Sequence, residues 1–386
     1  MGMQYMFHAP AVVTFAEGAR FTIGDTLKKW GVNGNVLLVH GKNVKAAGLV
    51  DEMAAGIEGA GFKTVAFDKV LPDAPVEVIR EGVAFAKENK VAAIVAIGGG
   101  SGMDIAKAIA VMMNNEGDIL NYVGMDVVPN RRNTLFVAVP TTCGTGSEMT
   151  DGGVVYDAAS AHKLPFWDVF AGPDIAILDP FMLQELPTHL IAQTALDAFA
   201  HSVEALTSVM ANPISDAVAL GAIEIIAKYT PIAYADKTNK EALEMLLTAS
   251  TMAGMAFNRS SIHAGHVIAH AVGAIAHIHH GAACALAMPL VLQEQALAVP
   301  EKVRRIAAAM GMNLDEKLSA EEVGKQVAAY VKDFNASLNI NSFGQYGIKE
   351  EQIEKILQYT GEDVMMQVAS KPIAQEMIGE FIKSNI

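Results

Sequence analysis

Aspartate and histidine residues recur at a four-residue spacing in the second half of this chain. Asp197 and His201 lie in the run DAFAH, and His266 and His270 lie in HVIAH. On a helix, side chains four residues apart lie about 40° from each other on one face, so each pair can hold one ion. Six of the 11 histidines fall between residues 263 and 280. This spacing and density favour a divalent-metal site.

The separation of these histidines along the chain restricts how they can meet. In one continuous helix, His266 and His280 would be about 21 Å apart at about 1.5 Å per residue. Both can reach one ion only if the helix ends and the chain turns back, and Gly273 and Gly281 are candidates for that turn. One aspartate and three histidines, with no thiolate, suit Fe(II) or Zn(II) with one position open for a substrate oxygen. A metal site without catalysis and a pH-responsive histidine cluster are the alternatives.

The two cysteines, Cys143 and Cys284, stand in apolar or glycine-rich runs with no paired spacing. We therefore expect no disulfide framework, and a reducing, cytoplasmic location. For both residues, a buried small side chain is the interpretation that we favour over a metal ligand.

Two loops rich in glycine and hydroxyl side chains follow runs that are typical of buried strands. In VAAIVAIGGGSGMDIAKAIAV, residues 98–102 form the loop, and a helix is predicted to begin near Met103, which takes the place of the third glycine of the usual dinucleotide fingerprint. Free N–H groups at a helix start, reached closely over glycines, can bind phosphate. The second loop, PTTCGTGSE (140–148), adds hydroxyl groups at the same sheet edge. Together they indicate a cofactor with a pyrophosphate and a ribose, although ordinary structural loops have a similar composition.

The elements that would position these residues differ between the two halves of the chain. Short β-branched runs alternate with helical segments in the first half, which predicts an α/β Rossmann-like domain with a parallel sheet. The second half shows a period near 3.6 and predicts an all-α domain. We expect a dinucleotide-binding domain over 1–186 and a metal-binding and substrate domain over 187–386. The predicted strands are 35–41, 64–70, 92–100, 134–142 and 175–180, and the main predicted helices are 51–60, 76–89, 191–206, 215–227, 240–255 and 321–334.

Composition excludes several classes of partner. The formal net charge is −14, which disfavours nucleic acid and anionic lipid as the main partner, because both require clustered basic residues. The N-terminal run MGMQYMFHAP carries no targeting signal, and the apolar stretches 91–97 and 282–292 are shorter than the roughly 20 residues that cross a bilayer. We expect a protein that acts on a small molecule and binds neither nucleic acid nor membranes.

Taken in order, the runs GGGSGMDIAKA, PTTCGTGSE, AILDP, ALDAFAHSVEA, HVIAHAVG and HHG resemble those of the iron-containing (group III) alcohol dehydrogenase family. The resemblance extends from about residue 5 to about residue 340. It implies a Rossmann-like N-terminal domain and a helical C-terminal domain, with the nicotinamide and the metal meeting in the cleft. A homo-oligomer is expected as well.

Matched residue by residue, the resemblance assigns roles to individual side chains. It implies Asp197, His201, His266 and His280 as metal ligands, and His270 as a proton relay or ribose contact near the nicotinamide and the substrate. The pyrophosphate site corresponds to Gly98, Gly99, Gly100, Ser101 and Asp104. Positions around the adenosine, ribose and nicotinamide correspond to Thr141, Thr142, Thr145, Ser147 and Lys163.

The chain departs from the family pattern at several positions. Gly41 stands where the family has an acidic residue that pairs with the ribose hydroxyls, which leaves room for a 2′-phosphate that His40 or Lys42 could contact. We therefore expect NADP(H) to be preferred over NAD(H). Asp73 replaces a common asparagine in LPDAP, and Ala195 replaces a glycine before Asp197. The C-terminal Asn-Pro-Arg signature is missing around ASKPIAQEM.

The reaction implied is the interconversion of a small primary alcohol and its aldehyde. The alternatives within the same fold are a glycerol dehydrogenase-like polyol oxidation and a dehydroquinate-synthase-like lyase. The lyase would need a basic pocket for a carboxylate and a phosphate, whereas Arg259 is the one basic residue near the predicted metal helices. A non-catalytic binder of metal or nucleotide is a third alternative.

Overall fold

The computed structural model describes residues 4–160 and 162–386 and divides the chain into two compact units. An α/β unit comprises residues 8–142 and 146–185. A helical unit comprises residues 186–386, the segment 143–145 and residues 4–7. The expected absence of a targeting signal concerns residues 1–10, of which the first three lie outside the described residues.

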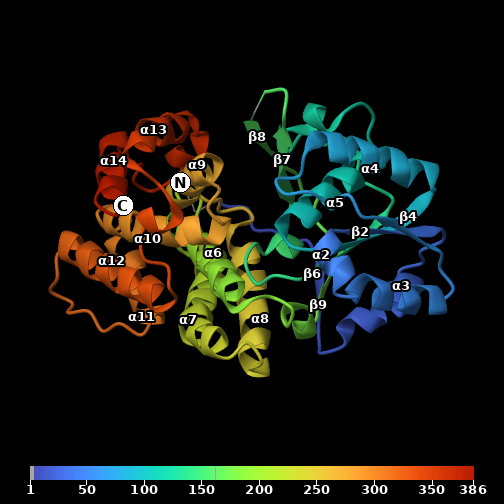
Figure 1. Ribbon diagram of the computed structural model, residues 1–386, viewed down its shortest axis with the longest axis horizontal. Helices are drawn as coiled ribbons and strands as arrows, with labels where there is room; N and C mark the ends of the chain where they lie inside the picture. Colours follow the sequence, from blue (N-terminus) through green and yellow to red (C-terminus); the bar gives the residue numbers. More distant parts are fainter. Residues whose placement is uncertain (1–3, 161) are drawn as a thin grey trace. The chain divides into compact units, whose positions relative to one another are not determined.

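A six-stranded parallel sheet forms the centre of the α/β unit. Its strand order is β1-β9-β6-β4-β2-β3 (Figure 1). The five predicted strands are all present, whereas the edge strand β1 was not predicted. The strands are β1 (Val12–Phe15), β2 (Asn35–His40), β3 (Thr64–Phe67), β4 (Val91–Gly98), β6 (Leu135–Pro140) and β9 (Ile175–Leu178).

Helices cover both faces of this sheet because alternate strand residues point to opposite sides. In β2, Val36 and Leu38 pack with α1 (Ile23–Lys29) and α3 (Leu49–Gly59). Leu37 and Val39 pack instead with α4 (Val76–Glu88) and α5 (Gly100–Met112). The result is a three-layer α/β/α arrangement, and the predicted Rossmann-like fold is confirmed.

Two features of the α/β unit differ from the predictions. A second, three-stranded sheet is formed by β5 (Gly124–Met125), β8 (His162–Trp167) and β7 (Gly152–Asp157), none of which was predicted. Helix α5 begins at Gly100, not near Met103, because the backbone of the glycine-rich run itself forms the first helical turn. The N–H groups of residues 100–102 are therefore the free donors at this helix start.

The described part of the helical unit contains nine α-helices. The predicted helical segments lie within α6, α7, α8 and α12. Every residue of α6 from Ile191 to Thr207 is buried, so this helix runs through the centre of the unit. The helices are α6 (Thr188–Thr207), α7 (Pro213–Ala235), α8 (Lys240–Phe257), α9 (Ala264–Ala276), α10 (His280–Ala296), α11 (Pro300–Ala309), α12 (Ala320–Ser337), α13 (Ile353–Glu362) and α14 (Gln375–Lys383).

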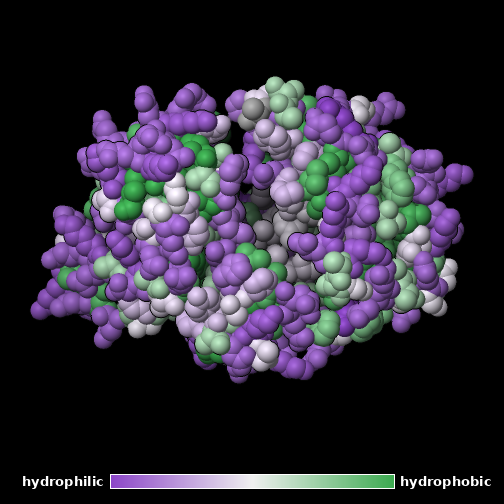
Figure 2. Space-filling view, in the orientation of Figure 1, coloured by the Kyte–Doolittle hydropathy of each residue, from purple (hydrophilic) through white to green (hydrophobic). Residues whose placement is uncertain are grey.

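Helix α7 is longer than the predicted helical segment 215–227 that lies within it. Among the described residues it is the one helix long and apolar enough, by length and composition, to cross a membrane. It packs against α6 and α8 and carries Pro231 in its interior. Length and apolar composition alone do not distinguish the core helix of a soluble protein from a membrane-spanning helix. On the face shown in Figure 2, hydrophilic side chains cover most of the surface, and hydrophobic residues form small separate patches.

Candidate metal centre and cofactor loops

Three helices of the helical unit bring the candidate ligands together. Helix α6 carries Asp197 and His201, α9 carries His266 and His270, and α10 begins with His280. Because α9 ends at Ala276 and α10 starts four residues later, the chain makes the reversal that the sequence required. The turn is at His277, whose left-handed backbone (φ 54°) caps α9. Gly273 lies inside α9 and Gly281 inside α10, so neither glycine is the turn.

Gly281 instead permits a close contact between α10 and α6. A Cβ at this position would lie 1.9 Å from the carbonyl oxygen of Gln193 in α6. Only glycine permits the backbones of α6 and α10 to approach this closely. His280 is adjacent to Gly281 in α10, and Asp197 lies beside the contact in α6. The backbones of α6 and α10 therefore set the spacing of these two side chains.

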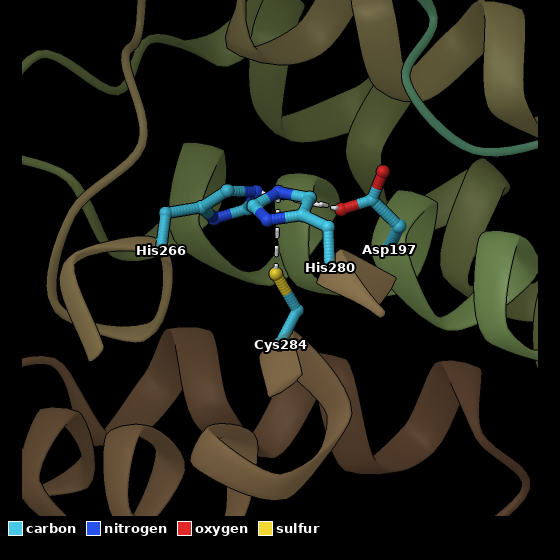
Figure 3. A group of neighbouring side chains, drawn as sticks. All are labelled: Asp197, His266, His280 and Cys284. Carbon is cyan, nitrogen blue, oxygen red and sulfur yellow. Dashed lines mark hydrogen bonds and ion pairs between the residues drawn. The ribbon is translucent and has the colours of Figure 1, made fainter. Parts of the chain in front are cut away.

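Ligand atoms of Asp197, His266 and His280 converge on one point (Figure 3). The Nε2 atoms of His266 and His280 lie 3.6 Å and 3.5 Å from Asp197 Oδ1. N–H···O hydrogen bonds are shorter, about 2.7–3.2 Å. Two ligands each about 2.1 Å from a tetrahedral ion would be separated by about 3.4 Å. The observed distances therefore match a shared ion better than direct hydrogen bonds.

Unpaired polar atoms support the same interpretation. Asp197 Oδ1 and His266 Nε2 are buried and have no hydrogen-bond partner among the described residues. An unsatisfied buried polar atom costs about 1–3 kcal/mol. A divalent ion at this point would satisfy both atoms, so the residues present fit a metal.

Glu204 orients His266 and was missed in the sequence. Its carboxylate accepts hydrogen bonds from His266 Nδ1 and from the backbone N–H groups of His263, Gly265 and His266 at the start of α9. Burial alone would raise the pKa of Glu204, but the neighbouring His263 and His266 lower it to about 2. Its bond to Nδ1 leaves Nε2 of His266 facing Asp197. Glu204 follows Asp197 by seven residues on the same helix face, a spacing that could have identified it.

His201 lies beside this group but outside it. Its ring stacks on His266 and on Phe257, with centroids 4.4 Å and 4.2 Å apart. The four residues whose ligand atoms lie within 4.8 Å of one another are Asp197, His266, His280 and Cys284. Burial lowers the pKa of His201 to about 4, so the ring is neutral at neutral pH. Its role as a ligand remains a prediction.

Cys284 is the fourth member of this group and was not expected there. It is fully buried, and its sulfur lies 3.7 Å from His280 Nε2 one turn earlier in α10. Burial raises the pKa of the thiol to about 12. From its sequence context, Cys284 was expected to be a small buried side chain and not a metal ligand. Its four-residue spacing from His280, the same as that of Asp197 and His201, was the signal that was not used.

His270 lies next to the group without joining it. Its ring is 5.4 Å from that of His280, and its Nδ1 lies 4.0 Å from Asp363 Oδ2. Asp363 was not identified from the sequence. The partly exposed imidazole and its neighbouring carboxylate form a pair that can accept or release a proton.

In the α/β unit, the predicted phosphate loop joins β4 to α5 and contacts the hydroxyl-rich loop. Gly98 and Gly99 end β4 and cap α5, and Gly100 and Ser101 begin that helix. The backbone N–H of Thr141 donates to the carbonyl of Gly98, which joins the two predicted loops. A Cβ at Gly99 would lie 3.1 Å from the side chain of Thr142, so this close packing favours glycine.

Other predicted cofactor residues lie around the start of α5. The hydroxyl of Ser101 accepts from the Asp73 N–H, and the Asp73 carboxylate lies 2.8 Å from Lys163 Nζ. Asp104 accepts from the N–H of Val154, and burial raises its pKa to about 6. The structure thus brings Asp73, Ser101 and Lys163 together.

The hydroxyl-rich loop is divided between the two units. Thr145 belongs to the segment 143–145 of the helical unit, whereas Thr141, Thr142 and Ser147 belong to the α/β unit. That these four residues donate hydrogen bonds to a cofactor stays a prediction. Residues 143 and 144 pack against α6, where the Cys143 sulfur lies 3.3 Å from Thr194 Oγ1 and a Cβ at Gly144 would lie 2.9 Å from Thr194.

Lys107 was also missed, although it lies in the motif GGGSGMDIAKA. It is completely buried, and its ammonium donates to Ser147 Oγ at 2.8 Å, Thr150 Oγ1 at 2.7 Å and the Gly152 carbonyl at 2.6 Å. Burial lowers its pKa to about 8. Lys107 thereby fixes the end of the hydroxyl-rich loop against α5.

Gly41 precedes α2 (Lys42–Ala46) at the end of β2. A Cβ there would meet only Val70, at 3.9 Å, so a larger residue would fit. His40 is buried, which corrects the suggestion that it could reach a 2′-phosphate. Lys42 is exposed, and Lys45 is paired with Asp51.

Comparisons with known proteins cover both units. The description "Iron-containing alcohol dehydrogenase" matches residues 10–180, and "Fe-containing alcohol dehydrogenase family, C-terminal" matches residues 191–386. The NAD-dependent methanol dehydrogenase of Bacillus methanolicus is 34% identical over 98% of this chain and 99% of its own length. The NADPH-dependent butanol dehydrogenase of Clostridium saccharobutylicum is 30% identical over 83% of this chain and 82% of its own.

A solved structure agrees with these relatives. The crystal structure of a 1,3-propanediol oxidoreductase has a TM-score of 0.94 and 30% identity, and covers 100% of both chains. Relatives with NAD and with NADPH dependence are both present, so the family model and the relatives together establish a nicotinamide-linked enzyme. On this basis the chain belongs to the iron-containing alcohol dehydrogenase family.

Proposed function

We propose that this enzyme interconverts a small primary alcohol and its aldehyde, with a nicotinamide dinucleotide and one divalent ion, Fe(II) or Zn(II). The observation that carries the proposal is the convergence of Asp197, His266 and His280, with two buried ligand atoms that lack hydrogen-bond partners. The three relatives described above are named for methanol, butanol and 1,3-propanediol, which are small primary alcohols.

The charges of the site suit an electrophilic centre. Asp197 is the one carboxylate in the group, so a divalent ion held there with neutral histidines would retain a net positive charge. When bound, such an ion supplies Lewis acidity, which lowers the pKa of a hydroxyl group by up to about 9 units, on the order of 12 kcal/mol. Glu204 holds His266 in the tautomer whose Nε2 faces the group.

His270 can act as the base that accepts the proton released in alcohol oxidation. Alcohol oxidation transfers a hydride from the carbon to the nicotinamide and a proton from the oxygen to a base. The imidazole of His270, beside the Asp363 carboxylate, can accept that proton and pass it to solvent. General-base assistance of this kind contributes about 10²- to 10⁴-fold in rate, so it adjusts the reaction while the metal dominates.

NADP(H) is the preferred cofactor in this proposal. Gly41 presents no carboxylate to repel a 2′-phosphate, and the exposed Lys42 can donate a charge-assisted hydrogen bond of about 1.5–3 kcal/mol. That free energy corresponds to a preference of about tenfold to a hundredfold.

We further propose self-association through the edge strand β1. Among the described residues it pairs with β9 alone, and its side chains Val12, Val13 and Phe15 are 57%, 42% and 42% exposed. An open apolar edge of this kind favours strand pairing with another chain. Light scattering of the wild type and Val13→Lys tests this, and two species of equal mass would contradict it.

We also propose a cytoplasmic location, because Cys143 and Cys284 are free and buried. Cell fractionation tests this proposal, and enrichment outside the cytoplasm would oppose it. The net charge of −14 makes nucleic acid and anionic membranes unsuitable partners.

The deciding experiment is a cofactor-linked assay. The chain is freed of metal, reloaded anaerobically with Fe(II) or Zn(II), and mixed with short primary alcohols or aldehydes and each cofactor. We expect a steady change in nicotinamide absorbance that depends on metal and substrate. A lyase would leave the absorbance unchanged, and a glycerol dehydrogenase-like enzyme would favour glycerol over the simple alcohols.

A further inference from the structure

The proposed metal site contains one more potential ligand than the alcohol dehydrogenase function requires. We propose that Cys284 binds the ion through its sulfur, giving this site a thiolate that favours soft divalent ions such as Zn(II) over Fe(II). The inference rests on the function proposed above, because it concerns the same ion.

The first argument is the position of the sulfur. Cys284 and His280 lie one turn apart on α10, so both side chains face the same way. The sulfur is 3.7 Å from His280 Nε2. A sulfur about 2.3 Å and a nitrogen about 2.1 Å from one tetrahedral ion would be separated by about 3.6 Å. The measured distance fits two ligands of one ion.

The second argument comes from the other members of the group. Figure 3 shows Asp197, His266, His280 and Cys284 pointing toward one another from three helices. Their ligand atoms all lie within 4.8 Å of one another. Asp197 Oδ1 and His266 Nε2, both buried, have no hydrogen-bond partner among the described residues and are directed into this space. These unpaired atoms indicate an ion between the four side chains, so the cysteine does not stand alone.

The alternative is an ordinary S–H···N hydrogen bond from Cys284 to His280. It accounts for the 3.7 Å distance, but it would occupy the Nε2 lone pair of His280, which the proposed function assigns to the ion. An ion accounts for all four atoms at once. Thiolate is a soft ligand, so its presence should raise the affinity for Zn(II) more than that for Fe(II).

The experiment uses Co(II) bound to the full chain, since cobalt reports a thiolate ligand through a sulfur-to-metal charge-transfer band. The chain has two cysteines, which allows a matched control. We expect the band in the wild type and in Cys143→Ser, and its loss in Cys284→Ser. Zinc affinity, measured by competition with a chelator, should fall at least about tenfold in Cys284→Ser, with a smaller change for Fe(II).

Each outcome is decisive. Cobalt bound to the wild type without the band, or a band that persists in Cys284→Ser, overturns the role of Cys284 and leaves the proposed function intact. Failure of the wild type to bind any divalent ion overturns both. If Cys284→Ser does not fold, the wild type and Cys143→Ser still decide, because a band in Cys143→Ser can come only from Cys284.

Discussion

Replacing Glu204 by glutamine tests whether this buried carboxylate holds the metal helices together. Glu204 accepts from four N–H groups at the start of α9, and an amide keeps one acceptor oxygen while adding an NH₂ group that faces donors. About two of the four donors then lose their acceptor. At about 1.5–3 kcal/mol for each bond to a charged group, the loss is about 3–6 kcal/mol. The same change frees the ring of His266, which should weaken metal binding about 10- to 100-fold.

The assay measures the urea midpoint of unfolding and the metal dissociation constant for the wild type and Glu204→Gln. Glu294→Gln is the matched control, because Glu294 is another buried carboxylate of the helical unit, paired with Lys371 and not in contact with the metal group. We expect both variants to unfold at lower urea but only Glu204→Gln to lose metal affinity. Unchanged affinity in Glu204→Gln, or an equal loss in Glu294→Gln, would refute the reasoning.

Four further predictions follow from the site. His266→Ala and His280→Ala should each abolish tight metal binding, and an unchanged metal content by elemental analysis would remove that residue from the ligand set. His270→Ala should keep its metal and lose about tenfold or more in turnover, because the imidazole lies outside the group, and loss of metal would be the contrary result. Gly41→Asp should shift the ratio of catalytic efficiencies toward NAD, and an unchanged ratio would show that position 41 is away from the ribose. The folded pKa of Lys107 is lowered from 10.5 to about 8, so between these values the unfolded chain binds more protons and stability contributed by this group rises with pH. The urea midpoint of the wild type should therefore rise relative to Lys107→Met between pH 8 and 10.5, whereas a falling difference would contradict the burial of a neutral amine.

The predicted strands were those with strong local signals. Strands such as β4, buried on both faces, need continuous β-branched or apolar residues, and this need appears directly in the sequence. Strand β1 has a β-branched run of only four exposed residues, VVTF, and in β5, β7 and β8 glycine, proline or charged residues interrupt the apolar run. The metal-site residues that could be predicted from the sequence were also those with a local pattern. Pairs four residues apart on one helix could be recognised, as in Asp197 and His201.

Relations between helices could not be recognised from the sequence in the same way. Which side chains of α6, α9 and α10 converge with Asp197 depends on how these helices pack, and no local pattern contains that information. The turn at His277 uses a left-handed backbone, which is uncommon in residues other than glycine and gives no clear signal in the sequence. Glu204 acts on α9 from α6, across a contact that joins residues 62 positions apart.

The complete burial of α6 from Ile191 to Thr207 determines how an ion would enter and leave. Asp197 sits on a helix with no loop that could swing open, and His266 is buried on its neighbour. Escape of an ion therefore requires either its release through the more exposed His280 or the opening of the whole helical unit. Release past His280 requires the metal–ligand bonds to break one after another. Opening of the helical unit costs the folding free energy of that unit. The residence time of the ion should consequently be long compared with a catalytic cycle, so that one ion serves many turnovers.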